Sequence, residues 1–571
     1  MKTRFVTRQY DPALVMRLTA EGYSRPVAQA LAGRRVVSRG EMDTSLASLI
    51  PPSSMPGADE AARMLADALE AGNKVCIVGD YDCDGATAVA VAVRGLEQLG
   101  FSRSSLAWFV PHRLDMGYGL SPVVVDAVCE KFGRPDLIVT VDNGTASLEG
   151  VARAHELGIR VLVTDHHLAG QELPAADCFV NPNAAEVPAS TRNLAGVGVF
   201  FYVLIALRSE LRRRGAFANR PQPNLASLLP LVALGTVADV VPLDRNNRIL
   251  VAQGLERLRK GQRCAGLTAL FDIATQGRRP VSSASVKDLG FSLAPRINAA
   301  GRIATMDIGI ECLLAEAGAA ESYADELEEI NRERKELEQS MQAEALEDLA
   351  GMDLSGRSSV VLHREGWHQG LVGLISSRIK EKIGRPVISF ADTGDGCLRG
   401  SGRSVAGIHL RDALERVNAS HPGVLLRFGG HALAAGLTIR KEALAEFTEA
   451  FDEEAARAAG PDAFTSEVTV DGALSPEDFT FGLVSEIDSI VWGQNFEAPL
   501  FANNFRVVRQ QLLRNGEHLR LTLETGGLSL EAVYFRHGAY LPDTARLAFR
   551  PDINEWQGRR TLQLLIEDFE E

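Results

Sequence analysis

Short apolar runs alternate with amphipathic stretches through the first half of the chain. Four runs between residues 74 and 165 have the length of buried strands: KVCIVGD, LAWFVPH, DLIVTVD and IRVLVTD. Apolar positions at helical spacing separate them, over 86–99, 121–132 and 146–157. Strands that alternate with helices predict βαβ units and a parallel sheet. Two further hydrophobic helices are expected, over 195–213 and 225–241.

The remaining pattern predicts four more regions around this α/β domain. A mostly helical extension precedes it, and a long helix follows it. A second α/β block comes next, with SSVVLH and RPVISF as strands. Five or six alternating strands at the end of the chain predict a small OB-like barrel. The expected boundaries are 1–70 for the extension, 71–315 for the first α/β domain, 316–350 for the helix, 351–459 for the second α/β domain and 460–571 for the barrel.

The long helix carries a narrow apolar stripe on an acidic surface. Five residues form it at spacings of four, three, seven and four: Tyr323, Leu327, Ile330, Leu337 and Met341. A linker helix packed along one seam explains such a stripe. A dimerising coiled coil is the alternative, but it needs roughly three to four heptads of repeat. We therefore favour a linker helix in a monomer.

Composition is typical of a globular protein in a reducing compartment. Hydrophobic residues make up 46% of the chain, which is ordinary for a protein with several cores. The apolar runs are much shorter than the roughly 18 residues of a membrane span, and the N-terminus lacks the apolar core of a signal peptide. The seven cysteines are scattered and form no Cys-x-x-Cys pair. This favours free thiols and a cytoplasmic location without membrane attachment.

The net charge of −14 argues at first against a nucleic-acid partner. Its distribution weakens that objection, because residues 316–348 hold twelve acidic residues against three basic ones. Residues 501–560 hold nine arginines against six acidic residues. Phosphate contacts act within about a Debye length, so the local balance of charge matters more than the total.

Carboxylates and histidines gather where the predicted strands end. Four motifs hold them, GDYDCDG, VDNG, TDHH and GTVADVVPL, and the last of these follows a hydrophobic helix. The residues are Asp80, Asp82, Asp84, Asp142, Asp165, His166, His167 and Asp239. Ligand sites in parallel sheets lie outside the carboxyl ends of the strands, so we expect the first three motifs to converge.

Such a group of carboxylates requires cations. Carboxylates packed together repel, and without compensation some must bind protons. Oxygen ligands with a few imidazoles suit Mn²⁺ or Mg²⁺, and two such ions can hold a phosphate and activate water. Taken singly, Asp142 and Asp239 are typical turn or capping residues, and the two histidines also fit a hydrogen-bonded surface pair. A calcium loop from Asp80 is excluded, because Val91 occupies the twelfth position, which requires glutamate. The four motifs together favour a two-metal phosphoesterase.

These motifs, in this order, resemble those of the DHH phosphoesterases and, most closely, the bacterial RecJ single-strand-specific exonucleases. Further segments extend the resemblance over nearly the whole chain: PHRLDMGYGL, LAPRINAAGRI, EGWHQGLVGLISSRIKEK, GSGRS and RFGGHALAAGL. Cys83 stands where alanine is expected and Ala88 where serine is frequent, and neither position is an expected ligand. The resemblance implies a parallel-sheet DHH domain, a linker helix, an α/β DHH-associated domain and an OB-like barrel.

The resemblance also implies a role for each residue of the cluster. Two Mn²⁺ or Mg²⁺ ions are expected on five ligands: Asp82, Asp84, Asp142, His166 and Asp239. Three further residues complete the catalytic set: Asp80, Asp165 and His167. Asp80 adjoins the ligands, Asp165 orients the histidines, and His167 contacts the scissile phosphate. For His167 a purely structural hydrogen bond is the alternative.

A pocket for the 5′-phosphate is the next implication of the resemblance. Arg113, Ser401 and Arg403 are its expected residues, since arginine forks suit a terminal phosphate. Considered alone, the string GSGRS is more typical of a flexible surface turn.

Six more residues are expected to contact the DNA by the same resemblance. They are Arg296, Asn298, Arg302, Gly429, Gly430 and His431. The local pattern of the first three also fits helix capping and salt bridges. The last three match the glycine-histidine motif of the DHH-associated domain, which closes over the substrate.

Arginines and aromatic residues are interleaved in the terminal β-domain, which is typical of an OB surface that binds single strands. The arginines are Arg506, Arg509, Arg514, Arg520, Arg536 and Arg550, and the aromatic residues include Phe505, Tyr534, Phe535 and Trp556. About half of these aromatic residues could equally belong to the barrel core.

The resulting expectation is a 5′→3′ exonuclease specific for single-stranded DNA that releases 5′-mononucleotides during DNA repair and recombination. A single-strand-binding protein and a helicase are expected partners. One alternative is a DHH phosphodiesterase acting on short oligonucleotides or cyclic dinucleotides, which the extra barrel argues against. Another is a non-catalytic single-strand binder, which the complete set of carboxylates and histidines argues against.

Overall fold

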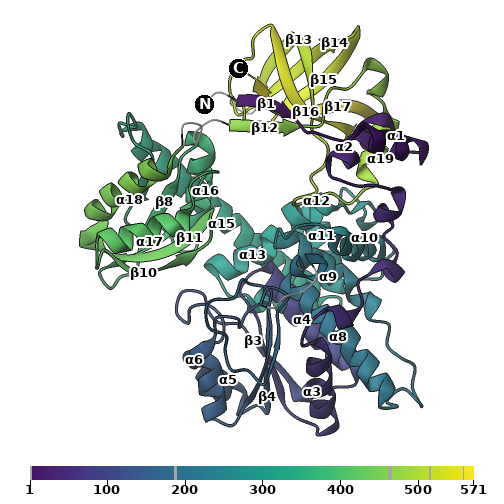
Figure 1. Cartoon of the computed structure of the whole chain (residues 1–571), viewed down its shortest axis with the longest axis vertical. Helices are drawn as coiled ribbons and strands as arrows, with labels where there is room; N and C mark the ends of the chain where they lie inside the picture. The colour runs from purple at the N-terminus through teal and green to yellow at the C-terminus, as the bar shows by residue number, and fades with distance from the viewer. Residues whose placement is uncertain (1–2, 185–188, 461–465, 514–515, 557–558, 571) are drawn as a thin grey trace. The chain divides into compact units, whose positions relative to one another are not determined.

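The chain forms two compact units in the computed structural model, which describes residues 3–184, 189–460, 466–513, 516–556 and 559–570. One unit comprises 42–334 and 491–497, and the other 1–41, 335–490 and 498–571. Figure 1 shows the helices and strands of both. Among the described residues we find no helix with the length and hydrophobicity that a bilayer crossing requires.

The first unit is built on a five-stranded parallel sheet. Its order is β3-β2-β4-β5-β6, with bounds Leu106–Phe109, Val75–Val78, Leu137–Val141, Arg160–Thr164 and Cys178–Val180. Every residue of β2 and β4 is buried, as in strands that helices cover on both faces. This sheet confirms the parallel α/β domain expected from the alternating pattern.

Helices cover both faces of this sheet. On one face, α5 (Pro122–Phe132) and α6 (Leu148–Glu156) enclose a core of aliphatic side chains. On the other face, α4 (Cys83–Leu99) and α8 (Gly196–Arg213) contact the strands and each other (Figure 1). The unit also holds α3 (Ala58–Glu70), α7 (Ala189–Arg192), α9 (Leu229–Ala238), α10 (Arg245–Arg259), α11 (Ala265–Thr275), α12 (Val286–Asp288), α13 (Ala294–Ile303) and α14 (Asp307–Leu314).

Helix α4 begins earlier than its apolar periodicity predicts. The sequence pattern places its start at residue 86, whereas the helix starts at Cys83. Asp82 explains the difference, because its Oδ1 accepts a hydrogen bond from the N–H of Gly85 at 3.0 Å and caps the helix. Asp84 therefore lies buried in the first helical turn.

The long helix expected after this domain is present as α15 (Ala319–Ala350). Leu327, Ile330 and Met341 of its apolar stripe are buried. A helix packed along one seam has this pattern, which agrees with the linker interpretation.

The second α/β block is a mixed sheet with the order β10-β11-β9-β8-β7. The bounds are Leu425–Gly430, Ala434–Arg440, Cys397–Arg403, Val387–Asp392 and Val360–His363. Strands β7 and β8 run parallel, and the other neighbours run antiparallel. Helices α16 (Val372–Ile383), α17 (Leu410–Ser420) and α18 (Leu444–Ala458) accompany the sheet, and Phe390, Phe447 and Phe451 are fully buried in its core.

Five terminal strands close into a barrel, which confirms the OB-like fold. The order is β13-β14-β15-β17-β16, with bounds Phe501–Leu513, His518–Thr525, Leu528–Tyr534, Arg559–Glu570 and Thr544–Trp556. One more predicted strand, β12 (Ser466–Val470), precedes these five and lies outside the barrel. Helix α19 (Phe481–Asp488) follows β12.

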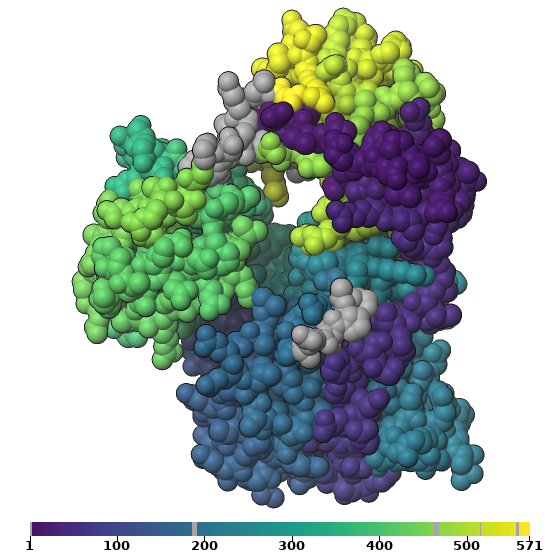
Figure 2. Space-filling model, viewed as in Figure 1, coloured from purple at the N-terminus to yellow at the C-terminus, as the bar shows by residue number. Residues whose placement is uncertain are grey.

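The N-terminal residues differ from the predicted helical extension. Helices α1 (Pro12–Ala20) and α2 (Arg25–Gly33) are present, but strand β1 (Thr3–Thr7) precedes them and pairs in parallel with β12. Figure 2 shows these purple residues against the yellow-green C-terminal ones. Asp471, which follows β12, binds Arg8 at 3.2 Å and Arg34 at 2.7 Å. The partner strand lies far away in the sequence, so no local pattern indicates this pairing.

Candidate active site

The strand-end motifs meet at the carboxyl edge of the parallel sheet. Three groups of side chains have ligand atoms within 4.8 Å of one another. They are Asp142 with His166 and His167, Asp84 with His166 and Asp239, and Asp80 with Asp82 and Asp142. Shared members join the groups into one cluster that contains every residue predicted as a metal ligand, together with Asp80 and His167.

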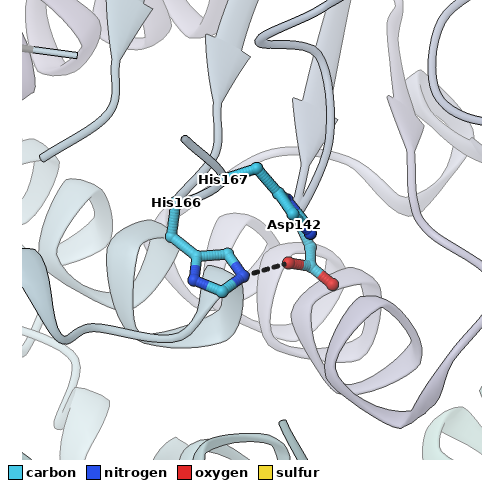
Figure 3. Close-up of side chains that lie close together, drawn as sticks. All are labelled: Asp142, His166 and His167. Atoms are coloured by element: carbon cyan, nitrogen blue, oxygen red, sulfur yellow. Dashed lines mark ion pairs between the residues drawn. The ribbon is translucent and has the colours of Figure 1, made fainter. Parts of the chain in front are cut away.

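His166 faces the carboxylates. Its Nε2 lies 3.2 Å from Oδ1 of Asp142 and 3.5 Å from Oδ2 of Asp239. Figure 3 draws the first of these ion pairs as a dashed line. Nε2 of His166 and Oδ1 of Asp142 are both buried, and neither has a hydrogen-bond partner among the described residues. Burial, followed by the charge of His167, lowers the pKa of His166 to about 4, so its ring is neutral at pH 7. A neutral imidazole beside two carboxylates is a suitable donor set for Mn²⁺ or Mg²⁺.

Four carboxyl groups of the cluster have a raised pKa. Burial and then the charge of Asp82 raise the pKa of Asp84 to about 7. The pKa values of Asp80, Asp142 and Asp239 also rise well above the usual range, first through burial and then through neighbouring carboxylates. In the described part of the chain, the ion pairs of these five aspartates involve histidine and no lysine or arginine. Divalent cations would remove the repulsion that the protein itself leaves uncompensated.

Asp165 organises the two histidines. Its Oδ1 accepts hydrogen bonds from the backbone N–H groups of His166 at 2.7 Å and His167 at 3.1 Å, and lies 2.8 Å from Nδ1 of His167. Its Oδ2 accepts a bond from the N–H of Thr145 at 2.8 Å. Burial opposes ionisation of both side chains, but their mutual hydrogen bond and charge hold the pKa of Asp165 below its usual range and raise that of His167 to about 9. This geometry suits the orienting role predicted for Asp165.

Two glycines let helices approach the carboxylates closely. The N–H of Gly196 donates to Oδ2 of Asp84 at 2.6 Å, and the N–H of Val197 donates to Oδ1 at 3.1 Å. Asp84 thus accepts bonds from the positive end of α8. A β-carbon at Gly196 would clash with the carboxylate of Asp142, and one at Gly235 would lie 2.6 Å from Oδ1 of Asp84. Any larger residue at either position would displace a predicted ligand.

Sequence reasoning missed three residues that hold the histidines. The hydroxyl of Tyr118 lies 3.1 Å from Nδ1 of His167. Asn181 donates to the carbonyl of His167 at 2.8 Å, and Asn183 to that of His166 at 2.5 Å. The two asparagines follow β6 in the string FVNPN, so the same strand-end rule could have found them.

Comparisons with known proteins identify the family. Residues 74–236 match the DHH family, N-terminal domain, residues 356–457 the DHHA1 domain, and residues 470–568 the RecJ OB domain. The chain is 44% identical over 552 residues to the single-stranded-DNA-specific exonuclease RecJ of Escherichia coli, with 94% of each protein covered. It is 43% identical over 550 residues to the same enzyme of Haemophilus influenzae, again with 94% of each covered. The chain belongs to the RecJ family.

Solved RecJ structures share its fold. RecJ of Thermus thermophilus in complex with Mn²⁺ superposes with a TM-score of 0.82 at 29% identity, covering 100% of this chain and 79% of that one. RecJ of the same organism in complex with Mg²⁺ superposes with a TM-score of 0.77 at 28% identity, covering 100% of this chain and 78% of that one. These comparisons confirm the resemblance and the fold class.

Two of the residues predicted for the 5′-phosphate pocket lie together in the DHHA1 domain of this RecJ-family chain. Nη1 of Arg403 donates to Oγ of Ser401 at 3.1 Å. A β-carbon at Gly373, in the first turn of α16, would lie 2.9 Å from that oxygen and 3.1 Å from Nη2 of Arg403. The first four residues of GSGRS belong to strand β9, so the flexible-turn alternative is wrong. A helix N-terminus with a hydroxyl and a guanidinium suits a phosphate. Arg113, predicted with these residues, belongs to the first unit, where its guanidinium lies 4.8 Å from the ring centre of Tyr81.

The PRINAAGR residues make contacts within the protein. Arg296 is buried, and its Nε lies 2.5 Å from Glu328 of α15. Oδ1 of Asn298 accepts a bond from the N–H of Cys83 at 2.9 Å, at the start of α4. Arg302 is half-buried on α13. These contacts match the salt-bridge and capping alternative for the first two, and a role of all three in DNA contact stays a prediction.

The glycine-histidine motif forms the turn between β10 and β11. Gly429 and Gly430 end β10, and the N–H of His431 donates to the carbonyl of Ala434 at 2.8 Å. The imidazole of His431 is exposed. The turn therefore presents a polar ring to solvent, and its contact with DNA stays a prediction.

The barrel divides the predicted aromatic residues between core and surface. Phe505 and Tyr534 are buried, whereas Phe535 is exposed. Arg514 lies outside the described residues, as does the side chain of Trp556. The core alternative is thus right for two of the aromatic residues.

Proposed function

We propose that this RecJ-family chain is a metal-dependent exonuclease that degrades single-stranded DNA from the 5′ end and releases 5′-mononucleotides. The observation that carries the proposal is the convergence of seven ligand-type side chains around two buried atoms, Oδ1 of Asp142 and Nε2 of His166, that form no hydrogen bond with the described residues. Relatives with 43% and 44% identity are named for single-stranded-DNA-specific exonuclease activity, and matching structures contain Mn²⁺ or Mg²⁺.

Two Mn²⁺ or Mg²⁺ ions are the proposed cofactors. Their ligands are Asp82, Asp84, Asp142, His166 and Asp239, with Asp80 beside them. When bound, such a pair of ions activates water and neutralises charge on the phosphate and the leaving oxygen. The protein keeps His166 neutral by burial, and the amides of α8 fix the carboxylate of Asp84.

His167 is the proposed contact for the scissile phosphate. Asp165 binds its Nδ1 at 2.8 Å and raises its pKa to about 9, so the imidazole is protonated at pH 7. The remaining Nε2–H then donates to a phosphate oxygen and offsets its negative charge. Tyr118, with its hydroxyl 3.3 Å from Nε2, helps to hold the ring in that orientation.

The proposed direction of degradation depends on a 5′-phosphate pocket at the N-terminus of α16. A terminal 5′-phosphate carries more charge than an internal diester, and the helix N-terminus, Ser401 and Arg403 supply donors for it. Arg113, which the resemblance groups with these residues, belongs to the other unit, and its contact with the 5′-phosphate stays a prediction. Arg296, Asn298, Arg302 and the Gly429–His431 turn are the proposed contacts along the strand.

A role in DNA repair and recombination, with a helicase and a single-strand-binding protein, completes the proposal. The seven cysteines are free thiols, which fits the reducing cytoplasm. The protein is proposed to act as a monomer, since the stripe of α15 suits a linker helix.

End-labelled oligonucleotides test the proposal directly. Single- and double-stranded DNA, labelled at either end, is incubated with Mn²⁺ or with a chelator. We expect labelled mononucleotides from the 5′ end of the single strand, and none without metal. Hydrolysis of dinucleotides or cyclic dinucleotides alone would instead support a small-substrate phosphodiesterase, and binding without turnover a non-catalytic binder.

A further inference from the structure

A short segment from the C-terminal half of the chain belongs to the first unit. Residues 491–497 lie between α19 and β13 in sequence, yet they form part of the unit that is built on the parallel sheet. Their two large rings, Trp492 and Phe496, are 8% and 4% exposed and stack with their centres 5.1 Å apart. Because the chain enters and leaves the segment from the other unit, specific contacts must hold it in the first.

The segment folds into a tight turn. Gly493 and Phe496 form an antiparallel bridge and exchange two backbone hydrogen bonds of 3.0 Å. Asn495, inside the turn, has φ of 58°, a left-handed conformation that asparagine adopts more readily than most residues. Because Gly493 and Phe496 bond to each other, the carbonyl of Gln494 is left to accept a bond from outside the turn.

The turn packs on the loop that follows Asp239, residues 240–244. The carbonyl oxygen of Gln494 accepts a hydrogen bond from the N–H of Leu243 at 2.8 Å. Gly493 touches the side chain of the same leucine, since a β-carbon at Gly493 would lie 2.4 Å from its Cδ1. Leu243 is buried and lies four residues after Asp239, a proposed metal ligand. The turn is therefore in direct contact with a loop of the active site.

Helix α10 joins the turn to this loop from a second side. The guanidinium of Arg248 lies 4.2 Å from the centre of the Phe496 ring, and its Nη1 donates to the carbonyl of Leu243 at 3.1 Å. Arg248 is buried, so its cation–π contact is shielded from solvent. Asn247 donates to the carbonyl of Pro242 at 2.9 Å. Both backbone polar groups of Leu243 and the carbonyl of Pro242 are thus bonded.

The loop needs these contacts because Val240 has an unfavourable backbone conformation. Its φ is 61°, in the left-handed region that a β-branched residue rarely adopts. Such a conformation persists only where the surrounding structure enforces it. On one side, the N–H of Asp239 donates to the carbonyl of Gly235 at 2.9 Å and ends α9. On the other side, the contacts of Leu243 hold the loop. Releasing that side would let Val240 rotate and would turn the adjacent carboxylate of Asp239.

We propose that Gln494 and Phe496 are positioning residues for Asp239 and act through Leu243 and the strained backbone of Val240. Groups that orient a metal ligand affect how tightly the metal binds. Loss of these contacts should therefore weaken metal binding while the chemistry at saturating metal is retained. The inference rests on the proposed function, which makes Asp239 a ligand, and adds residues outside the metal cluster.

The affinity of the full-length protein for Mn²⁺ tests this role without substrate. The electron paramagnetic resonance signal of free Mn²⁺ gives the Kd of the wild type and of Phe496→Leu, which keeps an apolar side chain but removes the ring beneath Arg248. We expect the Kd to rise about tenfold in the variant. Its exonuclease activity should fall at low Mn²⁺ and recover at saturating Mn²⁺, with the KM for DNA unchanged.

A glycine at Val240 separates positioning from a general structural role. Glycine adopts the left-handed conformation without the steric cost that valine has, so it should depend less on the turn. Val240→Gly should therefore restore most of the Mn²⁺ affinity that Phe496→Leu loses. Phe271→Leu is the matched control, because it removes a fully buried ring 5.7 Å from Arg279 in the same unit. It should lower the Tm and leave the Kd for Mn²⁺ unchanged.

A second variant serves if Phe496→Leu does not fold. In Gly493→Ala the new methyl group would press on Leu243, and we expect weaker Mn²⁺ binding here too. Wild-type affinity in both variants would overturn the positioning role. An equal loss in Phe271→Leu, or no recovery with Val240→Gly, would also overturn it.

Failure of the proposed function has a different result. A wild-type protein that binds no Mn²⁺, or an Asp239→Ala variant that binds it as the wild type does, would remove the metal site together with this inference. Tight binding by the wild type, weak binding by Asp239→Ala and wild-type affinity of Phe496→Leu would keep the metal site and overturn the positioning role alone.

Discussion

The carboxylates of the catalytic cluster and those of the barrel surface differ in burial and in pairing. In the cluster, Asp84 and Asp142 are almost fully buried, and no lysine or arginine pairs with them in the described part of the chain. On the barrel, Glu524, Glu531 and Glu567 lie near solvent, and each pairs with an arginine of a neighbouring strand. Arginines therefore neutralise these three carboxylates of the barrel, whereas the cluster requires ions from solution.

This difference shows why the net charge of −14 says little about function. An exposed ion pair contributes only about 0–1 kcal/mol to stability, and its two opposite charges largely cancel. Buried unpaired carboxylates create a strong local demand for cations, although they add few charges to the total. Placement, and not number, gives the carboxylates their role.

Removing one buried charge should have the largest effect. Asp142→Asn keeps the shape of the side chain but removes the charge that two of the ligand groups share. We expect exonuclease activity with Mn²⁺ to fall on the order of a thousandfold or more. Asp59→Asn, an exposed aspartate on α3 of the same unit, is the control and should keep full activity. Near-normal activity of Asp142→Asn would show that the cluster is not the metal site.

Crowding the cluster without changing its charge is the next test. In Gly196→Ala the new methyl group would occupy the space of the Asp142 carboxylate. We expect about a hundredfold loss of activity and about 1–3 kcal/mol of lost stability from overpacking. Gly198→Ala, two residues along α8, meets only Leu194 at 3.2 Å and serves as the matched control. Equal effects of the two substitutions would point to a general change in the helix.

The 5′-phosphate pocket proposed at the start of α16 should affect end recognition more than chemistry. Arg403→Ala removes a guanidinium beside the first turn of that helix. We expect KM for 5′-phosphorylated strands to rise about tenfold, with kcat and the KM for 5′-hydroxyl strands little changed. Arg411→Ala, an exposed arginine of the same domain, controls for general charge. Unaltered preference for the 5′-phosphate would remove Arg403 from the pocket.

Metal should stabilise the protein more at pH 8 than at pH 6. The folded-state pKa of Asp84 is about 7, above an ordinary value of about 3.9, so stability is lost progressively as the pH rises through this interval. Mn²⁺ or Mg²⁺ takes the place of the proton, and it competes with fewer protons at the higher pH. Differential scanning fluorimetry with metal or chelator at both pH values measures this. An equal rise of Tm at pH 6 and pH 8 would contradict the protonation of the cluster.

Unpairing a surface charge should give the smallest effect. Glu524→Gln frees Arg506 from its cross-strand partner. We expect about a twofold gain in affinity for single-stranded DNA at low salt, which disappears at high salt. Stability should change by less than about 0.5 kcal/mol, because the pair is exposed. A large change in Tm would show that the barrel depends on this pair.

Local patterns predicted the elements of the catalytic sheet well and their exact limits less well. The run LIVTV predicted strand β4 correctly, because a strand whose residues are all buried is apolar along its length. The start of α4 was misplaced, since the capping bond of Asp82 to Gly85 extends the helix beyond its apolar face. Strand β1 was missed because its partner β12 lies far away in the sequence.

The sequence by itself determined the eight residues of the four motifs, the donor types and the family resemblance, because residue type and spacing are local properties. Only the tertiary structure decided which of these atoms lie within 4.8 Å of one another, and that Gly196 and Gly235 make room for them. It also decided that Arg296 meets Glu328 and that Phe505 enters the core while Phe535 remains exposed. Contacts between distant segments depend on how the elements pack, and packing is a property of the whole fold.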